Sequence, residues 1–376
     1  MKFWDLPGPS NFVGAICDSI RDGKCVIVAL PEPVPRSIEK RLYDSLGDSG
    51  FFVDRLEYST TQSPLQFLYS SYDLQIGNES RLTVDFFVKA LGNQARVIFI
   101  NNAQTGAKWG QWKAFIHEYE SRSRSIPSHL RTVILLVARG IPFLEIPQPE
   151  PALAIHQWSG VVSSIDMLAY CGVRLLDSGV NVIQRPLIAQ MLVSLSMWDV
   201  ELAEMLLAAD TKTLYKPFPL LKEYAVQRGW IENAEILEKC WESGTRDSFD
   251  GVESSHAAWY LAAGDKRKIE SMVWRAQAAV LLPKIEMHRL ELAPLICKEI
   301  KFPYTSGDYF FRDVNDLEIG NLAYLASDRK AKVPALIGDF ARKLKELRND
   351  LAHLRIVEEH RATDLQLLLP FDSTRR

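Results

Sequence analysis

Four short apolar runs in the first part of the chain constrain its fold more than any other feature. Three of them are rich in β-branched residues, and all four have about the length of a strand. The runs are residues 24–30 (KCVIVAL), 51–58 (FFVDRLEY), 96–100 (RVIFI) and 132–137 (TVILLV), with helical spacing between them at residues 37–46 and 109–121. Buried strands that alternate with helices are typical of parallel sheets. The sequence therefore predicts an N-terminal α/β domain with a parallel-type sheet.

The chain changes character at residues 145–151 (EIPQPEP), which contain three prolines. Prolines disfavour regular structure, so this stretch predicts a linker. Helical periodicity then continues at residues 161–176, 186–208, 220–228 and 231–241, and the polar residues 243–255 (SGTRDSFDGVESS) predict a second boundary. We therefore expect an α/β domain over residues 1–148, an all-α middle region over residues 152–248 and an all-α C-terminal domain over residues 252–376.

Composition excludes several classes of protein. With 47% hydrophobic and 24% charged residues, general disorder is not expected. The net charge of −3 gives no overall field that attracts nucleic acid, so any RNA contact has to be local. The five cysteines form no CxxC pair, which argues against a zinc ribbon or a disulfide framework. We expect neither a signal peptide nor a membrane span, and predict a soluble cytoplasmic protein.

The predicted sheet resembles that of a P-loop ATPase of the AAA or STAND type, but the phosphate loop is missing. In such proteins a glycine-rich loop with a lysine follows the first strand. Here residues 31–35 read PEPVP, in which the prolines lack N–H donors and Glu32 repels phosphate. Asn101 and Asn102 stand where the resemblance implies acidic Mg²⁺ ligands. A degenerate ATPase-like module and an unrelated α/β domain both stay open, and ATPase activity is not expected.

A long amphipathic helix is predicted over residues 333–357. Its apolar residues alternate spacings of three and four, which places them in one narrow stripe. They are Ile337, Phe340, Leu344, Leu347, Leu351 and Leu354. At about 100° per residue, Arg348 lies about 80° to one side of the stripe, Asn349 nearly opposite it and His353 about 140° to the other side. The stripe is therefore expected in the core and the three polar residues outside, with Asn349 and His353 one turn apart.

The run RNDLAH at residues 348–353 matches the RNxxxH form of the motif that marks the HEPN superfamily. Two earlier segments, residues 273–290 and 313–325, also resemble helices of prokaryotic HEPN proteins. The chain thus resembles this ribonuclease-like superfamily over roughly residues 254–360, most closely at the motif. The resemblance implies an all-α helical bundle in which Arg348, Asn349 and His353 are catalytic.

The resemblance also implies a mechanism and a partner. Cleavage of RNA without metal requires a proton to leave a 2′-hydroxyl and negative charge to be stabilised on phosphorus. His353 can move protons near neutral pH, Arg348 can hold two phosphate oxygens, and Asn349 can orient either group. HEPN nucleases generally pair two such helices, so we expect a homodimer or a HEPN-containing partner at this helix. Neither a metal nor another cofactor is expected.

Several polar residues of one earlier helical region leave alternatives open. Trp274, Gln277, Glu286 and Arg289 either flank the active site or form a core tryptophan and an intrahelical Glu–Arg pair. His288 has no second ligand at metal spacing and is expected at the surface.

These observations favour a metal-independent endoribonuclease of HEPN type that acts in prokaryotic antiviral or toxin-like defence. RNA is then the substrate, and the N-terminal part senses or docks a protein partner. Because some HEPN domains only bind RNA or partners, the alternative is a non-catalytic assembly or scaffold subunit of a larger defence complex.

Overall fold

The computed structural model describes residues 2–33, 37–58, 62–74, 82–91, 94–101, 108–231, 241–306, 309–327 and 333–370. The chain divides into two compact units, each made of two stretches of sequence. Unit 1 comprises Met1–Asp166 and Arg228–His256, and unit 2 comprises Met167–Gln227 and Ala257–Arg376. This division differs from the three successive parts expected from the sequence, because the chain leaves unit 1 and later returns to it.

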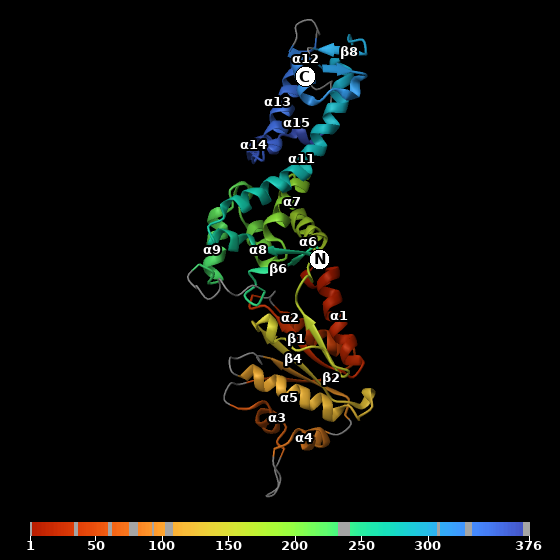
Figure 1. Ribbon diagram of the computed structural model, residues 1–376, viewed down its shortest axis with the longest axis vertical. Coiled ribbons are helices and arrows are strands. Elements are labelled where there is room, and N and C mark those ends of the chain that lie inside the picture. Colours follow the sequence, from red (N-terminus) through yellow and green to blue (C-terminus); the bar gives the residue numbers. More distant parts are fainter. Residues whose placement is uncertain are drawn as a thin grey trace. The chain divides into compact units, whose positions relative to one another are not determined.

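Unit 1 contains an open parallel sheet of five strands (Figure 1). The strand order is β2 (Phe52–Glu57), β3 (Arg96–Asn101), β4 (Val133–Arg139), β1 (Cys25–Leu30) and β5 (Leu153–Gln157), and every neighbouring pair is parallel. All residues of β1 are buried, as in a strand covered on both faces, whereas the edge strand β2 is exposed or half-exposed. The predicted parallel sheet and its four strands are confirmed.

The fifth strand, β5, lies beyond the predicted end of the α/β domain at residue 148. It pairs with β1, and Leu153 lies opposite Cys25. The proline-rich residues 145–151 therefore connect two strands of one sheet rather than two domains. The sequence does not reveal β5, because four of its five residues are half-exposed and the strand has no continuous apolar run.

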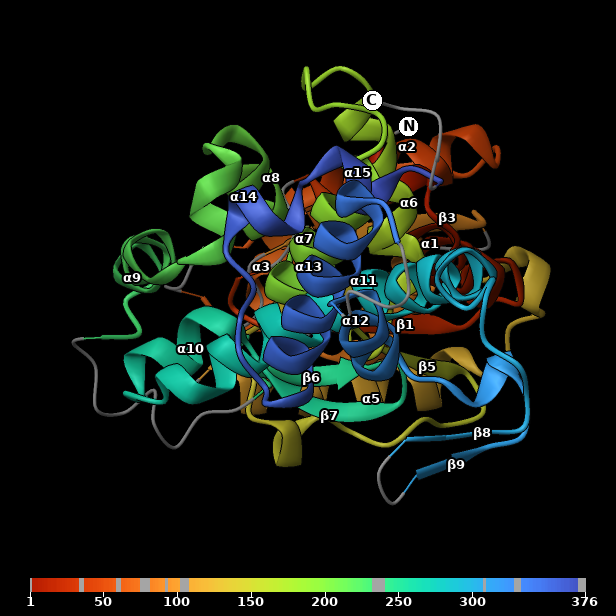
Figure 2. The same cartoon turned by 90° about the horizontal axis from the view of Figure 1, so that it is seen from above.

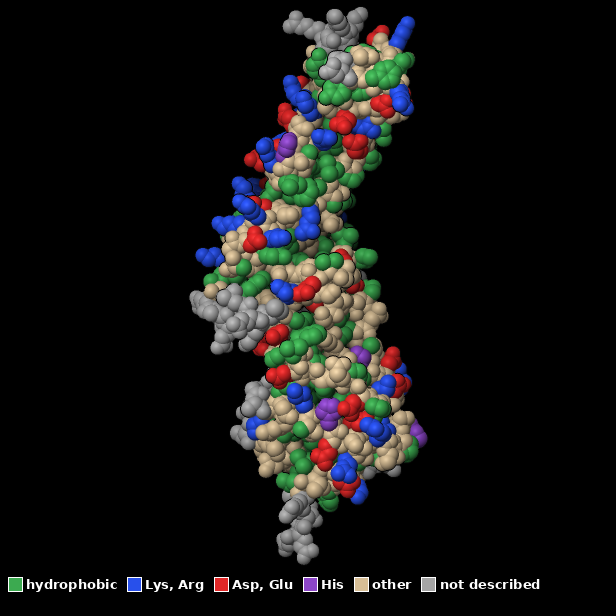
Figure 3. Space-filling view, in the orientation of Figure 1, with side chains coloured by type: hydrophobic (Ala, Val, Ile, Leu, Met, Phe, Trp, Pro, Cys, Tyr) green, Lys and Arg blue, Asp and Glu red, His purple; other side chains and the backbone are tan. Residues whose placement is uncertain are grey.

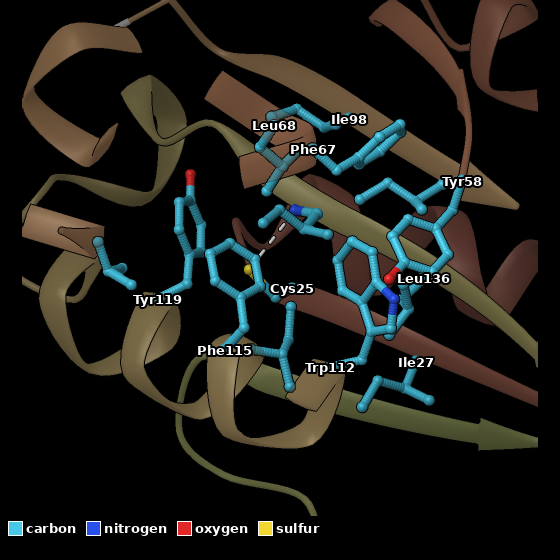
Figure 4. Packing of buried hydrophobic residues seen from close by; sticks show 14 of the residues in the cluster. Cys25, Ile27, Tyr58, Phe67, Leu68, Ile98, Trp112, Phe115, Tyr119 and Leu136 are labelled. Carbon is cyan, nitrogen blue, oxygen red and sulfur yellow. Dashed lines mark hydrogen bonds between the residues drawn. The ribbon is translucent and has the colours of Figure 1, made fainter. Parts of the chain in front are cut away.

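Helices pack on the sheet and supply most of its aromatic core. They are η1 (Phe3–Asp5), α1 (Pro7–Arg21), α2 (Ile38–Asp48), α3 (Pro64–Ser71), α4 (Val84–Leu91) and α5 (Lys108–Ser123), with the short turns η2 (Ser128–Leu130) and η3 (Phe143–Glu145). Figure 4 shows α5 directing Trp112, Phe115 and Tyr119 toward the strands. Trp112 packs edge-to-face on Tyr58, with 5.0 Å between the ring centroids. Large buried rings dominate core energetics, so this cluster holds α5 on the sheet.

A buried carboxylate joins α5 to the start of β5. Glu120 is fully buried, accepts a hydrogen bond from Arg124 at 2.7 Å and accepts another from the backbone N–H of Ala152 at 2.9 Å. Burial by itself raises the pKa of the Glu120 carboxyl, but the hydrogen bonds from Arg124 and Ala152 outweigh burial and lower that pKa. The ionised form of Glu120 is thus favoured in the folded chain.

The polar residues 243–255, expected to be a boundary, form a hairpin that belongs to unit 1. Its strands β6 (Arg246–Phe249) and β7 (Val252–Ser255) are antiparallel. Buried Asp247 anchors the hairpin by accepting hydrogen bonds from the Ser159 hydroxyl at 2.7 Å and from the Gly160 N–H at 3.1 Å. Burial raises the pKa of the Asp247 carboxyl. The helix expected at residues 231–241 lies almost wholly outside the described residues.

Unit 2 is mostly helical, as the sequence predicts for this part of the chain. Its helices are α6 (Ser164–Leu176), which begins in unit 1, α7 (Arg185–Ser196), α8 (Val200–Ala208), η4 (Thr211–Tyr215), α9 (Phe218–Gln227), α10 (Ala257–Ala262), α11 (Lys266–Ile296), η6 (Val314–Asp316), α12 (Ile319–Ser327), α13 (Ala335–Ala352), α14 (Glu359–Ala362) and α15 (Leu365–Leu368). An antiparallel hairpin of β8 (Tyr304–Ser306) and β9 (Tyr309–Phe311) interrupts them. This hairpin was not expected.

The helix expected over residues 186–208 is two helices, α7 and α8. Met197 has a φ of +53° and ends α7. Asp199 then caps α8 by accepting hydrogen bonds from the backbone N–H groups of Glu201 and Leu202. The apolar periodicity runs through the break because both helices bury their leucines.

The long helix α11 supports much of unit 2, since it contacts α7, α10, α12 and α13. Figure 2 shows α12 and α13 beside α11. The Ser194 hydroxyl of α7 donates a hydrogen bond to the Met272 carbonyl of α11 at 2.8 Å. α7, which was expected in the middle region, therefore packs on the same helix as α12 and α13 of the C-terminal region. Within the described ranges, no helix is long and apolar enough to cross a membrane.

We predict that Glu120→Gln lowers the free energy of unfolding by about 2 kcal/mol at pH 7, because it removes charge-assisted hydrogen bonds. A carboxyl whose pKa is lower in the folded state stabilises the fold above its unfolded pKa, and this contribution is lost as the pH falls through the folded pKa. The difference between wild type and variant should therefore disappear in acid. Urea denaturation between pH 3 and pH 8 measures it. A difference that stayed constant over this range would contradict the role given to the charge.

Candidate functional site

The motif residues lie at the C-terminal end of α13. The helix buries the apolar stripe expected from the sequence as far as Leu351. It ends at Ala352, so His353 is its C-cap residue and lies outside the helix. Leu354, which was expected in the stripe, is 68% exposed. The prediction of a helix over residues 333–357 with a buried Leu354 is therefore wrong at its C-terminal end.

A Schellman-type turn ends α13. The Leu354 N–H donates to the Leu351 carbonyl at 3.2 Å, and the Arg355 N–H donates to the Asp350 carbonyl at 2.9 Å. The turn requires a left-handed residue after the cap, and Leu354 supplies it with a φ of +58°. Glycine usually fills this position, and a residue with a Cβ is strained there. The sequence gives no glycine signal here, which is why the end of the helix was missed.

The three candidate residues lie on the accessible side of the helix end. His353 is exposed, and Arg348 and Asn349 are half-exposed, which agrees with their calculated positions around the helix axis. The His353 N–H donates to the Asn349 carbonyl at 3.0 Å, so these two residues are one turn apart as expected. The structure thus brings the three residues to one end of α13, with His353 carried by the turn.

Arg348 already has an acidic partner within unit 2. Its guanidinium donates to a carboxylate oxygen of Glu318 at 3.2 Å. Glu318 directly precedes α12, and the side chains of Arg348 and Glu318 are 42% and 70% exposed. Exposed ion pairs contribute little to stability, so an incoming phosphate can replace Glu318 at low cost. No signal in the sequence predicted this contact.

Two side chains of α11 hold the segment around His353. The Trp274 indole N–H donates to the Leu351 carbonyl at 2.8 Å. Gln277, which is fully buried, donates to the Val357 carbonyl at 2.8 Å and accepts from the Val357 N–H at 2.8 Å. Trp274 and Gln277 thus flank the candidate site, which is one of the two alternatives drawn from the sequence.

The expected intrahelical pair between Glu286 and Arg289 is confirmed, with 2.7 Å between the Arg289 Nε and a Glu286 carboxylate oxygen. Arg289 also donates to the carbonyls of Asn315 and Leu317 at 3.2 and 3.0 Å. These bonds attach the chain that leads into α12 to the C-terminal part of α11. Arg289 therefore has a structural role.

The expectation of a surface position for His288 is wrong, because His288 is only 2% exposed. Its Nε2 lies 2.7 Å from the Leu367 carbonyl, and its Nδ1 lies 3.0 Å from a Glu291 carboxylate oxygen. Its ring packs on Phe340 at 5.1 Å. The contacts with Phe340 of α13 and Leu367 of α15 come from far away in sequence and explain why the position of His288 could not be predicted.

In unit 1, polar residues gather at the carboxyl edge of the sheet, where open α/β sheets bind ligands. Glu39 forms an ion pair with Arg139 at the end of β4. The Asn101 amide at the end of β3 lies 3.5 Å from the other Glu39 carboxylate oxygen. Asn101 is buried. Asn102 and residues 34–36 lie outside the described residues. The Arg139 charge is thus neutralised within the unit.

Within the described ranges, no group of three or more His, Cys, Asp or Glu residues is placed to hold a metal ion. A comparison with family models finds none that matches the chain, and a comparison with curated proteins finds no similar sequence.

We predict that Leu354→Gly raises the free energy of unfolding by up to about 1 kcal/mol. Glycine removes the strain of the left-handed position, and its greater entropy in the unfolded chain offsets part of that gain. Ala352→Gly is the matched control and should lower the free energy by about 1 kcal/mol, because Ala352 is helical. Thermal or urea denaturation of both variants gives the signs. Equal destabilisation by both would contradict the strain at Leu354.

Proposed function

We propose that the chain is a metal-independent endoribonuclease of HEPN type, and that Arg348, Asn349 and His353 form its active site. The observation that carries the proposal is the placement of all three at one accessible helix end. A polymer can approach such a surface, where Arg348 would bind a phosphate and His353 would move protons. The Asn349 side chain is half-exposed beside them and would orient the phosphate or the imidazole.

The proposed reaction divides two proton transfers between histidines. The 2′-oxygen of one nucleotide attacks the adjacent phosphorus, the P–O5′ bond breaks, and a 2′,3′-cyclic phosphate and a 5′-hydroxyl result. One base takes the proton from the 2′-hydroxyl while one acid gives a proton to the 5′-oxygen. Arg348 would stabilise the charge that develops on the phosphate oxygens. One His353 cannot serve as base and acid at once, so a homodimer or a HEPN-containing partner would supply the second histidine.

Charge supports only local recognition of RNA. Unit 2 has 25 lysines and arginines against 23 aspartates and glutamates. Figure 3 shows acidic and basic side chains interspersed on the visible face rather than one continuous basic surface. Contacts to RNA would therefore be few, and binding would depend on the immediate neighbours of the site.

For unit 1 we propose a sensing or docking role toward a protein partner, within prokaryotic antiviral or toxin-like defence. The parallel sheet supports an ATPase-like ancestry, and the Glu39–Arg139 ion pair at its carboxyl edge supports a loss of nucleotide chemistry. That ion pair also favours the second candidate function, an assembly subunit without catalysis. With Arg139 neutralised, unit 1 would bind a protein partner and carry out no nucleotide chemistry.

Cleavage of end-labelled total tRNA and mRNA in EDTA tests the proposal. We predict that the wild type cuts RNA, and that Arg348→Ala and His353→Ala each lower the rate at least about 100-fold, the range for loss of an acid–base group or a charge-stabilising group. His360→Ala is the matched control, since His360 is another exposed histidine, seven residues later on α14. It should leave the rate unchanged. A monomeric protein that cuts nothing and co-purifies stoichiometrically with another subunit would support the assembly role instead.

Glu318 gives a further prediction on the same site. We expect Glu318→Gln to tighten RNA binding up to about fivefold, because it frees Arg348 from an exposed ion pair. The gain should shrink as salt is added. Glu299→Gln removes one exposed acidic group elsewhere in unit 2 and serves as control. Binding of an uncleavable 2′-O-methyl RNA by fluorescence anisotropy measures both, and equal gains would show an effect of net charge alone.

A further inference from the structure

The position of His353 is not set by the helix that carries the motif. α13 ends at Ala352, and the next residue after His353 is left-handed Leu354. Inside a helix, a residue is held by its own hydrogen-bond ladder on both sides. A C-cap residue has that ladder on one side only. Another part of the fold therefore has to hold the chain beyond His353.

α11 provides that support on both sides of His353. Trp274 binds the Leu351 carbonyl two residues before it, and Gln277 binds Val357 four residues after it. Trp274 and Gln277 are three residues apart and so lie on one face of α11. We call these two side chains the α11 clamp.

Gln277 is the stronger half of the α11 clamp. Both its amide oxygen and its amide nitrogen bond to Val357, each at 2.8 Å, and the side chain is fully buried. Two bonds to one residue fix the orientation of the chain as well as its position. If Gln277 lost one of these bonds, a buried polar group would be left without a partner, which destabilises the fold. The contact between Gln277 and Val357 is therefore favoured over other arrangements.

A third contact connects the same segment to α14. Arg361 donates to an Asp350 carboxylate oxygen at 2.7 Å, across the turn that contains His353. The side chain of His353 is left exposed by all of these contacts. The backbone is thus held on both sides while the imidazole stays accessible.

We propose that Gln277 and Trp274 are positioning residues for His353, an inference that rests on the proposed ribonuclease function. The clamp holds the turn so that the imidazole stands at a fixed place relative to the phosphate bound by Arg348. Arg348 lies five residues earlier, inside α13, and does not depend on the clamp. Loss of the clamp therefore lowers the cleavage rate and leaves RNA affinity intact.

The test uses the full-length protein with two variants and one control. Gln277→Met keeps an unbranched side chain of similar length and removes both bonds to Val357. Trp274→Phe removes only the bond to Leu351 and is the milder change. Ser194→Ala removes a side-chain bond of equal length, 2.8 Å, to a carbonyl of α11 at Met272, away from the motif. It controls for the loss of any one hydrogen bond in unit 2.

Three quantities are measured for each protein. They are the single-turnover cleavage rate of end-labelled RNA, the affinity for 2′-O-methyl RNA, and the histidine ring signals in ¹H–¹³C NMR spectra, with the His353 signal assigned by its loss in His353→Ala. We expect Gln277→Met to lower the rate roughly 10- to 100-fold, as for a misplacement of about 1 Å. Its affinity should stay within about twofold of wild type, and its His353 signal should shift or broaden. Trp274→Phe should do the same to a smaller extent, and Ser194→Ala should change none of the three.

The outcomes separate this inference from the proposed function. If the wild type cuts no RNA, the ribonuclease proposal fails, and the His353 signal alone decides whether the clamp positions the imidazole. An unshifted His353 signal in both clamp variants, or equal losses of rate and affinity, would overturn the positioning role. If Gln277→Met does not fold, Trp274→Phe decides by the same criteria.

Discussion

Burial of the apolar face of α13 against its neighbours in unit 2 is the constraint on which the candidate site depends. Phe340, Leu344 and Leu347 have to face inward, and a helix has only one rotation about its axis that achieves this. That rotation turns Arg348 and Asn349 toward solvent. The exposure of Arg348 and Asn349 is therefore a consequence of core packing, because no contact at the surface is needed to present these two side chains.

In unit 1, too, core packing determines where polar side chains gather, although the core is built on a sheet. A parallel strand such as β1 must be covered on both faces, and α5 covers one of them through Trp112 and Tyr119. The carboxyl edge of the sheet then collects polar groups from β3, β4 and α2. Glu39 and Arg139 meet there from distant parts of the sequence and neutralise each other. An edge that could attract an anion is therefore balanced within unit 1 itself.

The features that sequence reasoning predicted are those that depend on local periodicity. The buried strands and the inward face of α13 as far as Leu351 repeat at fixed spacings, and the structure has them. Leu354 continued the spacing of the stripe, so periodicity could not reveal that the helix stops before it. His288 was misplaced because its burial depends on the Leu367 carbonyl, which lies far away in sequence. The contact of Arg348 with Glu318 depends on the docking of α12 and was equally invisible.

The bonds that Trp274 and Gln277 make to the segment beyond α13 involve only main-chain atoms of Leu351 and Val357. Between these residues, Ala352, His353, Leu354 and Arg355 are all exposed. The bonds from α11 therefore hold the main chain without using the side chains that it displays there. Substitutions at the residues beside His353 can therefore change the ligand preference of this surface, while the main-chain bonds from α11 stay the same.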